Sequence, residues 1–414
     1  MSTEPTVLLT GGRAPVALHL ARLFKGAGFR VLSAESMKCS LLSFSNAVDR
    51  CFSLPGPVAD ETGFVEGLAS LIREQGVDWL IPTCEETFYI AKYRRELESH
   101  CRVLTDDLDT LARLHHKGGF IEELKRAGEL VPKTAVIRDL SDWQRAVEEI
   151  PFPAVLKPAY SRFATQVHFM EEPAAEPPVS LDRPWVLQER IPGPQLSTYA
   201  VAHRGRLTAY SCYRRVFRVG TGSSITFRHE AEPSLYRWTE RLVQRYRYTG
   251  QIAFDFIQSD KDGAYYPLEC NPRATSGIHL FTDASLVEAM VGSPSAVAFP
   301  DPGVKAMLGI PVLLYGWRQG KLRKWLKTLA THRDVIFDRR DPLPALGQGI
   351  SLLSLCMTAL RRRIPLLELT THDIEWEGEE DGKGTDHRRN GISRTSPGPA
   401  AEAVGTGGDR FRPE

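Results

Sequence analysis

Oxygen-bearing side chains gather at two neighbouring strand-like runs, residues 252–257 and 265–270. The first run contributes Asp255, the second contributes Glu269, and Asn271 directly follows the second run. Because successive side chains of a strand point to opposite faces, Glu269 and Asn271 share one face. Two carboxylates and an amide oxygen suit a hard cation, and Mg²⁺ is usually held by one or two carboxylates together with phosphates. These residues predict a Mg²⁺ site, and an ordinary surface hairpin is the alternative.

The register of this predicted hairpin decides whether its two carboxylates meet. Asp262-Gly263 between the runs is a turn signal. With residues 259–263 as the loop, Asp255 pairs with Pro267 and lies diagonal to Glu269 on the same face, about 7 to 8 Å away. Phenylalanines on both sides of Asp255 indicate that the opposite face is buried.

The balance of charges excludes several classes of protein. The 414 residues contain 52 Lys and Arg against 51 Asp and Glu, which gives a net charge of +1. A general nucleic-acid binder would be more basic, so no nucleic-acid partner is expected.

The most apolar stretch, residues 350–360, is shorter than the roughly 20 residues that cross a bilayer. The N-terminus also lacks the basic region of a signal peptide. We therefore expect a cytoplasmic protein without a membrane partner.

Hydrophobic patterning divides the chain into four regions. Residues 1–105 alternate short apolar runs with helical spacing, which predicts an α/β domain with a small parallel sheet. Strand candidates in residues 106–293 come mostly as hairpins, which is typical of an α+β fold. Residues 294–376 have a helical and basic pattern. Residues 377–414 are rich in Gly, Ser, Pro, Arg and Glu, a composition that predicts a disordered tail.

A helix is predicted at the start of the second region, because leucines recur at helical spacing between residues 108 and 124. Asp106 is the expected N-cap, and Gly128 is expected to close the helix in a left-handed conformation. Gly118 and Gly119 lie inside this helix and weaken it. They predict either a break or a close approach of another group to the backbone.

The run Glu269-Cys270-Asn271-Pro272-Arg273 resembles the Glu-x-Asn-Pro-Arg signature of ATP-grasp ligases, in the carbamoyl phosphate synthetase-like branch. Four upstream segments match this family in the required order: Lys117 in His-His-Lys-Gly-Gly, residues 153–158 with Lys157, residues 186–195, and residues 221–226. The resemblance covers about residues 1 to 290. It implies a Rossmann-like pre-ATP-grasp domain, then an ATP-grasp fold with a C-terminal helical accessory region.

The resemblance also implies a role for each matched residue. Lys117 and Lys157 would hold the triphosphate as compact positive charges. Arg273 would direct its guanidinium at the phosphoryl group in transfer. The remaining implied ATP contacts come from Gln188, Glu189, Ile191 and Gln195. The implied metal ligands are Asp255, Glu269 and Asn271, which would bind Mg²⁺, with Mn²⁺ as an alternative.

Two segments depart from the family pattern. Gln188 and Gln195 stand where family members commonly have acidic residues, although an amide can still hydrogen-bond an amino group or a hydroxyl. The segment after Lys157, residues 159–165, contains no glycine, whereas bare glycine amides usually cover the phosphates in this family. Arg162 and neighbouring hydroxyls could supply donors instead. The alternative is a regulatory nucleotide-binding protein that has lost catalysis.

As a member of this family, the chain would be a stand-alone carboxylate-amine ligase. It would use Mg-ATP to phosphorylate a small carboxylate and join it to an amine, releasing ADP and phosphate. Its partners would be these two small molecules, and a homodimer is left open. Glu85 and Glu86, after a predicted strand, are expected to contribute to the acceptor site. Four arginines would clamp a carboxylate or form a solvated rim: Arg214, Arg215, Arg218 and Arg228.

The N-terminal Gly11-Gly12 pair invites a competing dinucleotide interpretation, with Glu35 as the ribose-binding acid. Arg13 and Val16 stand where the motif needs its other glycines, and their side chains would obstruct a pyrophosphate. An NAD-dependent oxidoreductase is therefore disfavoured.

Overall fold

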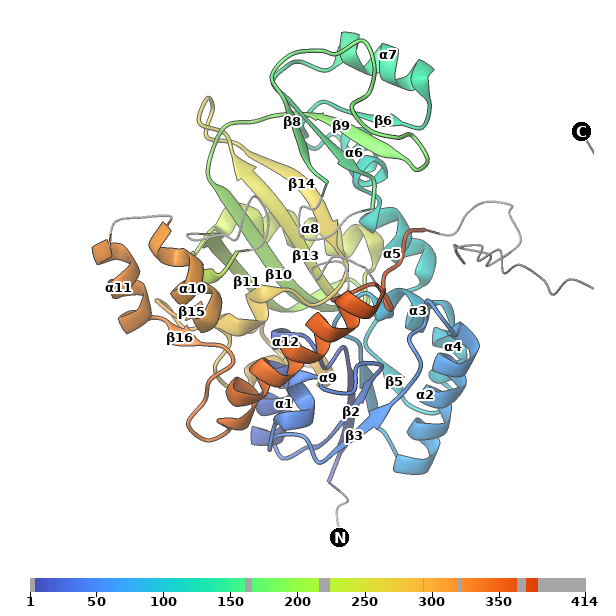
Figure 1. The fold of residues 1–414 in the computed structure, drawn as a ribbon, viewed down its shortest axis with the longest axis vertical. Coiled ribbons are helices and arrows are strands. Elements are labelled where there is room, and N and C mark those ends of the chain that lie inside the picture. Colours follow the sequence, from blue (N-terminus) through green and yellow to red (C-terminus); the bar gives the residue numbers. More distant parts are fainter. Residues whose placement is uncertain are drawn as a thin grey trace, which may run out of the picture. The chain divides into compact units, whose positions relative to one another are not determined.

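Three β-sheets and their helices make up the part of the chain that the computed structural model describes (Figure 1). That part comprises residues 4–160, 166–215, 224–292, 294–318, 322–362 and 370–378. Outside it lie residues 161–165 of the glycine-free segment after Lys157, residues 221–223 of the matched segment 221–226, and the predicted tail from residue 379 onward. Residues 1–377 group into one contact unit, so the domain boundaries predicted at residues 105 and 293 stay predictions.

The N-terminal region forms a five-stranded parallel sheet, as its alternating pattern predicts. The strand order is β3-β2-β1-β4-β5, and every pairing is parallel. The strands are β1 (Thr6–Thr10), β2 (Arg30–Glu35), β3 (Arg50–Ser53), β4 (Trp79–Ile81) and β5 (Arg102–Val103). The helices are α1 (Pro15–Gly26), the 3-10 helix η1 (Leu41–Phe44), α2 (Glu61–Gln75), α3 (Glu86–Lys92) and α4 (Arg94–Leu97). β3 escapes sequence prediction because it is a short, mostly exposed edge strand.

A second, antiparallel sheet of four strands has the order β6-β9-β7-β8. Its strands are β6 (Thr134–Ile137), β7 (Ala154–Pro158), β8 (His168–Met170) and β9 (Trp185–Glu189). Helix α7 (Leu140–Glu149) covers one face of this sheet (Figure 1). Ile137, Trp143 and Leu156 form part of the buried core between them. The sheet therefore holds Lys157 and Gln188 on two adjacent strands, β7 and β9.

The third sheet has seven strands in the order β14-β13-β10-β11-β12-β15-β16. They are β10 (Gln195–His203), β11 (Arg206–Arg215), β12 (Thr226–His229), β13 (Gly250–Gln258), β14 (Tyr265–Asn271), β15 (Lys305–Met307) and β16 (Arg333–Asp334). Beside them lie α8 (Pro233–Tyr246), the 3-10 helix η2 (Ser276–Leu280) and α9 (Ser285–Val291). The ring of Trp238 on α8 packs edge-on against Phe254 and Phe256. One face of β13 is therefore buried, and the face with Asp255 is the other one.

The predicted helix between residues 106 and 127 is broken, as its glycines suggested. The chain forms α5 (Leu108–His115) and α6 (Lys117–Arg126), with His116 between them. A Cβ on Gly118 would lie 2.3 Å from Val136, so a close approach also occurs. Gly128 has a φ of 76°, as expected after a helix. The predicted cap is wrong: Asp107 is the N-cap, and Asp106 accepts hydrogen bonds from the amides of Asp107 and Thr249.

Helices dominate the C-terminal region, as predicted. They are α10 (Gly309–Tyr315), the 3-10 helix η3 (Gly316–Arg318), α11 (Leu322–Thr331) and α12 (Leu343–Arg362). Among the described residues, one segment, Leu343–Arg361, is long and apolar enough to cross a membrane by length and composition alone. It exceeds the apolar run 350–360 because the helix continues through two glycines. Only 17% of it is buried, which distinguishes it from the core helix of a globular protein.

Candidate active site

The two predicted metal-binding carboxylates lie directly opposite each other. Asp255 on β13 pairs with Glu269 on β14, and not with Pro267 as the predicted loop length required. The loop has one more residue than predicted, and a β-bulge at Leu268 shifts the register once more. The observed pairing places the two carboxylates closer together than the predicted diagonal arrangement. Opposite residues in an antiparallel pair are about 4.5 to 5.5 Å apart at Cβ.

Lys117 reaches this pair from the first turn of α6. Its side chain is 5% exposed, and its Nζ lies 3.6 Å from Glu269 Oε2. Two hydrogen bonds fix this helix start: the amide of Gly119 donates to His116 Nδ1, and the amide of Lys117 donates to the carbonyl of Ala159 after β7. The break between α5 and α6 thus places a buried cation beside the carboxylates.

Lys157 supplies a second buried cation, from the end of β7. Its Nζ donates a hydrogen bond of 3.0 Å to Gln188 Oε1. Burial lowers the pKa of Lys157 from 10.5 to about 8; Glu269 opposes this shift, and Lys117 adds to it. Two lysines and two carboxylates therefore influence one another within a single site.

The structure gives Gln188 a contact that the sequence does not indicate. Its Oε1 accepts from Lys157, and its Nε2 donates to Thr134 Oγ1 at 3.0 Å. The amide side chain thus orients Lys157 on the neighbouring strand, whereas the resemblance implies a contact with the nucleotide. That nucleotide contact stays a prediction.

The other predicted ATP-binding residues follow Gln188 along the chain. The backbone amide of Glu189 donates to the carbonyl of Lys133, and Glu189 Oε1 accepts from the amide of Lys133. Ile191 is half-buried just after β9, and Gln195 begins β10 opposite Ile257. These residues lie on the segment that links the four-stranded and seven-stranded sheets, and their contacts with ATP stay predictions.

Ser197 and Arg273 extend the site along the strands. Ser197 Oγ donates to Asp255 Oδ1 at 2.6 Å from the adjacent strand β10. Arg273 Nη2 donates to Asn271 Oδ1 at 3.3 Å, and Arg273 Nε lies 3.7 Å from Glu85 Oε1. No sequence motif marks Ser197, because only the pairing of β10 with β13 brings it opposite Asp255.

Glu85 connects the predicted catalytic arginine to the C-terminal segment. Its carboxylate is almost fully buried, and its Oε2 accepts from the backbone amide of Trp376 at 3.4 Å. The Trp376 ring stacks on Phe88, with ring centres 4.6 Å apart, and meets Tyr160 edge-on. The predicted acceptor region is therefore bordered by Glu85, Arg273 and this aromatic cluster.

The other residues predicted near the acceptor site have structural partners. Glu86 accepts hydrogen bonds from Thr10 Oγ1 and from the amides of Thr83 and Cys84, which ties two strand ends together. Arg214 and Arg228 both pair with Glu230, which favours a surface rim over a substrate clamp. The side chain of Arg215 and all of Arg218 lie outside the described residues.

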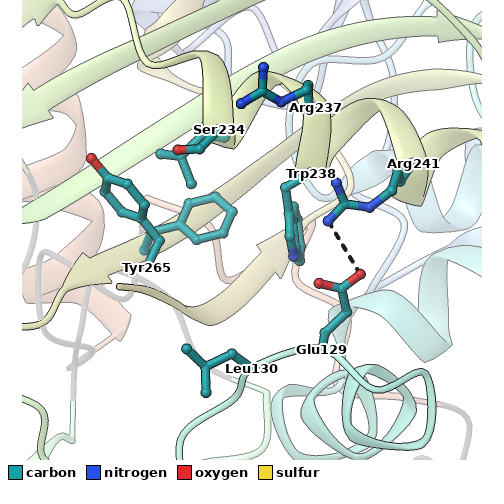
Figure 2. Close-up of a pocket in the computed structure, with 9 residues that line it drawn as sticks. Glu129, Leu130, Ser234, Arg237, Trp238, Arg241 and Tyr265 are labelled. Atoms are coloured by element: carbon teal, nitrogen blue, oxygen red, sulfur yellow. Dashed lines mark ion pairs between the residues drawn. The ribbon is translucent and has the colours of Figure 1, made fainter. Parts of the chain in front are cut away.

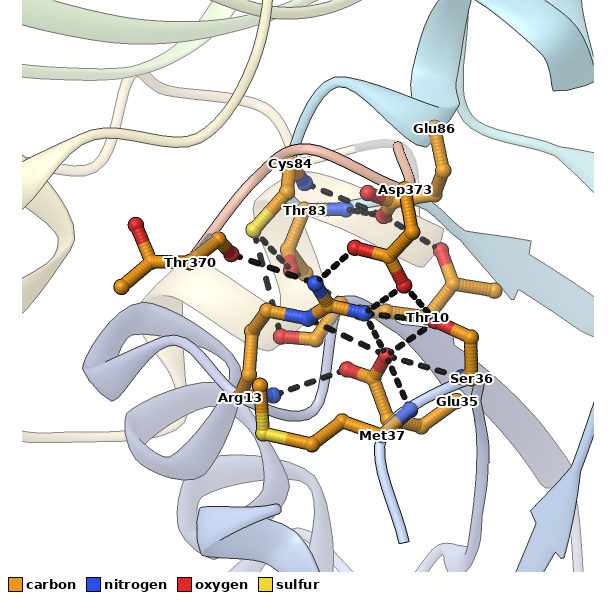
Figure 3. Close-up of polar contacts among 11 residues, drawn as sticks. Thr10, Arg13, Glu35, Ser36, Met37, Thr83, Cys84, Glu86, Thr370 and Asp373 are labelled. Carbon is orange, nitrogen blue, oxygen red and sulfur yellow. Dashed lines mark hydrogen bonds and ion pairs between the residues drawn. The ribbon is translucent and has the colours of Figure 1, made fainter. Parts of the chain in front are cut away.

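The N-terminal glycine loop holds a buried ionic network instead of a dinucleotide. Arg13 is bound by Glu35 and by Asp373 from the C-terminal segment, and Ser36 donates to Asp373 (Figure 3). Arg13 fills the place where the motif needs an open backbone, and Glu35 is engaged by it. A Cβ on Gly11 would lie 2.5 Å from Thr83 Oγ1, so packing accounts for this glycine.

A separate pocket lies on the other face of β13. Its volume is about 350 Å³, and its lining includes Trp238, Phe256 and Tyr265 (Figure 2). An ion pair of 3.5 Å between Arg241 and Glu129 lies at its edge. Because Phe256 and Asp255 point to opposite faces of the strand, this pocket does not contain the carboxylates.

The donor set at Asp255 and Glu269 suits a divalent cation that shares its coordination with a ligand. Both carboxylates are half-buried on one face, and Asn271 lies on the same strand as Glu269. Within the described ranges no three His, Cys, Asp or Glu side chains cluster, so the protein offers two carboxylates and an amide, not a closed cage. Mg²⁺ is typically bound in this way, with phosphate oxygens and water completing the coordination.

Comparisons with known proteins identify one domain of the chain. Residues 115–277 match the family model described as an ATP-grasp domain. No curated protein sequence matches this chain. The chain therefore contains an ATP-grasp domain over these residues, which confirms the resemblance to ATP-grasp proteins seen in this part of the sequence.

Solved structures share this fold at low sequence identity. N5-carboxyaminoimidazole synthetase from Staphylococcus aureus complexed with ADP has a TM-score of 0.59 at 13% identity, over 76% of this chain and 86% of that chain. L-amino acid ligase from Bacillus licheniformis has a TM-score of 0.55 at 17% identity, over 71% and 76%. Biotin carboxylase from Campylobacter jejuni has a TM-score of 0.56 at 14% identity, over 70% and 72%. At these identities the likeness shows the fold.

Proposed function

We propose that this protein is an ATP-dependent ligase that activates a small carboxylate and joins it to an amine. The observation that carries this proposal is the convergence of Lys117 and Lys157 on the paired carboxylates Asp255 and Glu269. Such a set can bind a triphosphate through its cations and a divalent metal through its anions. The similar solved structures include an L-amino acid ligase and an ADP complex, which supports the same general class.

The proposed chemistry has two steps. A carboxylate oxygen of the substrate attacks the γ-phosphorus of ATP, and the bond to ADP breaks, leaving an acyl phosphate. The amine nitrogen then attacks the acyl carbon, phosphate leaves, and the nitrogen loses a proton. The products are an amide, ADP and phosphate.

Each residue of the site has a defined task in this proposal. Lys117 and Lys157 hold the phosphates in line, and Arg273 stabilises charge on the transferring group. Asp255 and Glu269, with Asn271, would hold Mg²⁺ or Mn²⁺, which supplies neutralisation of phosphate charge when it is bound. Gln188 keeps Lys157 in place through their hydrogen bond. We further propose that Glu189, Ile191 and Gln195 contact the adenosine.

The partners and the cellular location are proposed from this reaction. The partners would be a small carboxylate and a small amine, with a homodimer left open. The reaction uses soluble metabolites and ATP, which supports a location in the cytoplasm.

Trapping the intermediate tests this function. Candidate carboxylates are incubated with Mg-ATP and hydroxylamine in place of the amine. A hydroxamate and ADP should form in equal amounts. Lys157→Ala and Arg273→Ala should suppress both products together, because the hydroxamate and ADP both depend on the same phosphoryl transfer to the carboxylate.

The nucleotide product separates this mechanism from its rivals. AMP and pyrophosphate would show attack at the α-phosphorus and would contradict the proposal. ATP binding without any product across a broad panel of acids and amines would instead favour a regulatory protein.

A further inference from the structure

Large hydrophobic side chains are exposed mainly in one stretch of the sequence. Nineteen are exposed in the described part of the chain, and fifteen of these lie between residues 310 and 360. Single exposed apolar residues are ordinary, but a concentration of this kind marks an interaction surface. The stretch contains α10, α11 and α12.

Helix α12 directs its large side chains away from the domain. A Cβ on Gly347 would lie 2.4 Å from the ring of Phe44, and Ser351 Oγ donates to the carbonyl of Cys39 at 2.6 Å. The helix therefore packs through small residues. Its exposed stripe recurs every three or four residues and consists of Leu343, Leu346, Ile350, Leu353, Met357 and Leu360.

Helices α10 and α11 combine exposed apolar groups with positive charge. They pack together through Val312 and Trp325, whose indole donates to the carbonyl of Val312. Residues 309–331 contain five Lys or Arg and no Asp or Glu. The exposed basic residues include Arg323, Lys324 and Lys327. The exposed apolar ones include Leu313, Leu314, Trp317, Leu322 and Leu326.

Segments before and after α12 are tied to the N-terminal region. Before the helix, Asp341 pairs with Arg22 of α1 at 2.9 Å. After it, Asp373 pairs with Arg13 at 2.5 Å. Because Gly347 and Ser351 within the helix also contact Phe44 and Cys39 of that region, the helix lies along the protein in this structure and is not separated from it as a spanning helix would be. Its apolar length is therefore available for lying along a surface.

We propose that α10, α11 and α12 bind the surface of an anionic lipid membrane and lie in the plane of its interface. Apolar side chains with Trp on one side and Lys or Arg beside them are the pattern of such interfacial helices. Basic residues near an anionic surface add electrostatic attraction. This revises the expectation, drawn from the sequence, that the protein has no membrane partner.

A second copy of the chain fits this surface less well than lipid does. In a two-fold symmetric pair the same patch meets itself, so Arg323, Lys324 and Lys327 would face other basic residues. Residues 343–362 also contain no Asp or Glu that could complement them. The α12 stripe likewise lacks the flanking charged pairs that usually fix the register of two coiled helices.

Vesicle co-sedimentation of the full chain tests this proposal. Phosphatidylcholine vesicles are compared with vesicles that also contain phosphatidylglycerol. The protein should bind the anionic vesicles and be released by high salt. The combined variant Arg323→Gln, Lys324→Gln and Lys327→Gln should weaken binding about a hundredfold at low salt.

Substitutions in the apolar stripe distinguish membrane binding through α12 from nonspecific adsorption to vesicles. The combined variant Leu346→Glu, Ile350→Glu and Leu353→Glu should abolish binding, while its thermal unfolding stays like that of the wild type. The combined variant Leu130→Glu, Leu140→Glu and Phe169→Glu is the matched control, because it adds the same charge at side chains that are 50%, 49% and 51% exposed outside the surface. It should bind vesicles like the wild type.

Three results would overturn the proposal. The first is no binding to anionic vesicles at low salt. The second is a dimer that the Leu346, Ile350 and Leu353 variant dissociates, in a protein that binds no vesicle. The third is retention on vesicles after alkaline carbonate treatment, because that indicates a spanning helix.

Discussion

Asp255 lies directly opposite Glu269 across the β13–β14 pair, and Glu269 is also 3.6 Å from Lys117. Glu269 is thus the carboxylate shared by the proposed metal site and the two lysines that are proposed to bind the phosphates. Glu269→Gln keeps the shape but removes the charge, so Mg²⁺-dependent turnover should fall on the order of a hundredfold or more. Steady-state kinetics over a range of Mg²⁺ concentrations would measure this loss.

The neighbouring residue provides the control for this prediction. Cys270 is buried on the other face, opposite Phe254. Cys270→Ala should leave turnover within about twofold while lowering stability by about 1 kcal/mol through a small cavity. A loss of turnover equal to that of Glu269→Gln would contradict the assignment of faces on β14.

Two adjacent glycines in α6 should respond differently to alanine. A Cβ on Gly118 would lie 2.3 Å from Val136, whereas the nearest atom to a Cβ on Gly119 is His116 Nδ1 at 3.3 Å. Gly118→Ala should cost about 1 to 3 kcal/mol of unfolding free energy and raise the KM for ATP, because the shift moves Lys117.

Gly119→Ala is the matched variant in the same turn. It should be near neutral, since alanine favours the helix by roughly 1 kcal/mol and the contact with His116 offsets part of that gain. Chemical denaturation and ATP kinetics of both variants would check this contrast. Equal losses would mean that the close approach to Val136 does not constrain the helix.

The strands that carry the site could be predicted from sequence because local patterns define them. Apolar alternation and an Asp-Gly turn are enough to locate β13 and β14. Their register could not be predicted, because the bulge at Leu268 and the additional loop residue leave no local signal in the sequence. Loop length alone therefore gave Asp255 the wrong partner.

Contacts between segments that are distant in the sequence could not be predicted either, because they also leave no local signal. The pairing of Gln188 with Lys157 requires β9 to lie beside β7, and the pairing of Arg13 with Asp373 joins residues 360 positions apart. In the sequence, Arg13 indicates only that the dinucleotide-binding motif is incomplete. Its ionic partner lies in a segment whose composition gave no such indication.

The Arg13 network should make stability depend on pH in a definite direction. Burial acts to raise the pKa of Asp373, but hydrogen bonds from Arg13 and Ser36 bring it below its ordinary value of 3.8. Because the pKa of Asp373 is lower in the folded protein than in the unfolded chain, the ionised carboxylate stabilises the fold at pH values above 3.8. This stabilisation is lost as the pH falls through the folded-state pKa.

Asp373→Asn should therefore lower stability by about 1 to 3 kcal/mol at neutral pH, through the loss of charged hydrogen bonds. The gap in Tm from the wild type should stay constant between about pH 7 and pH 5 and shrink below about pH 4. Asp301→Asn, at an exposed position, is the control and should show no such gap. A gap that persists unchanged at the acid end would contradict a role for the ionised carboxylate.

The buried amine of Lys157 should make ATP binding depend on pH. Its pKa is about 8 because burial disfavours the charged form, whereas bound phosphates favour that form and raise the pKa in the complex. Binding therefore takes up a proton above pH 8, and the Kd for a non-hydrolysable ATP analogue should rise by up to about tenfold per pH unit. Lys157→Arg stays charged throughout and should show a flat profile. Gln188→Glu places an anion beside the amine, so it should move the onset of weakening to higher pH. Calorimetry in buffers of different ionisation heat measures the proton uptake directly, and equal uptake by the wild type and Lys157→Arg would assign the titration to another group.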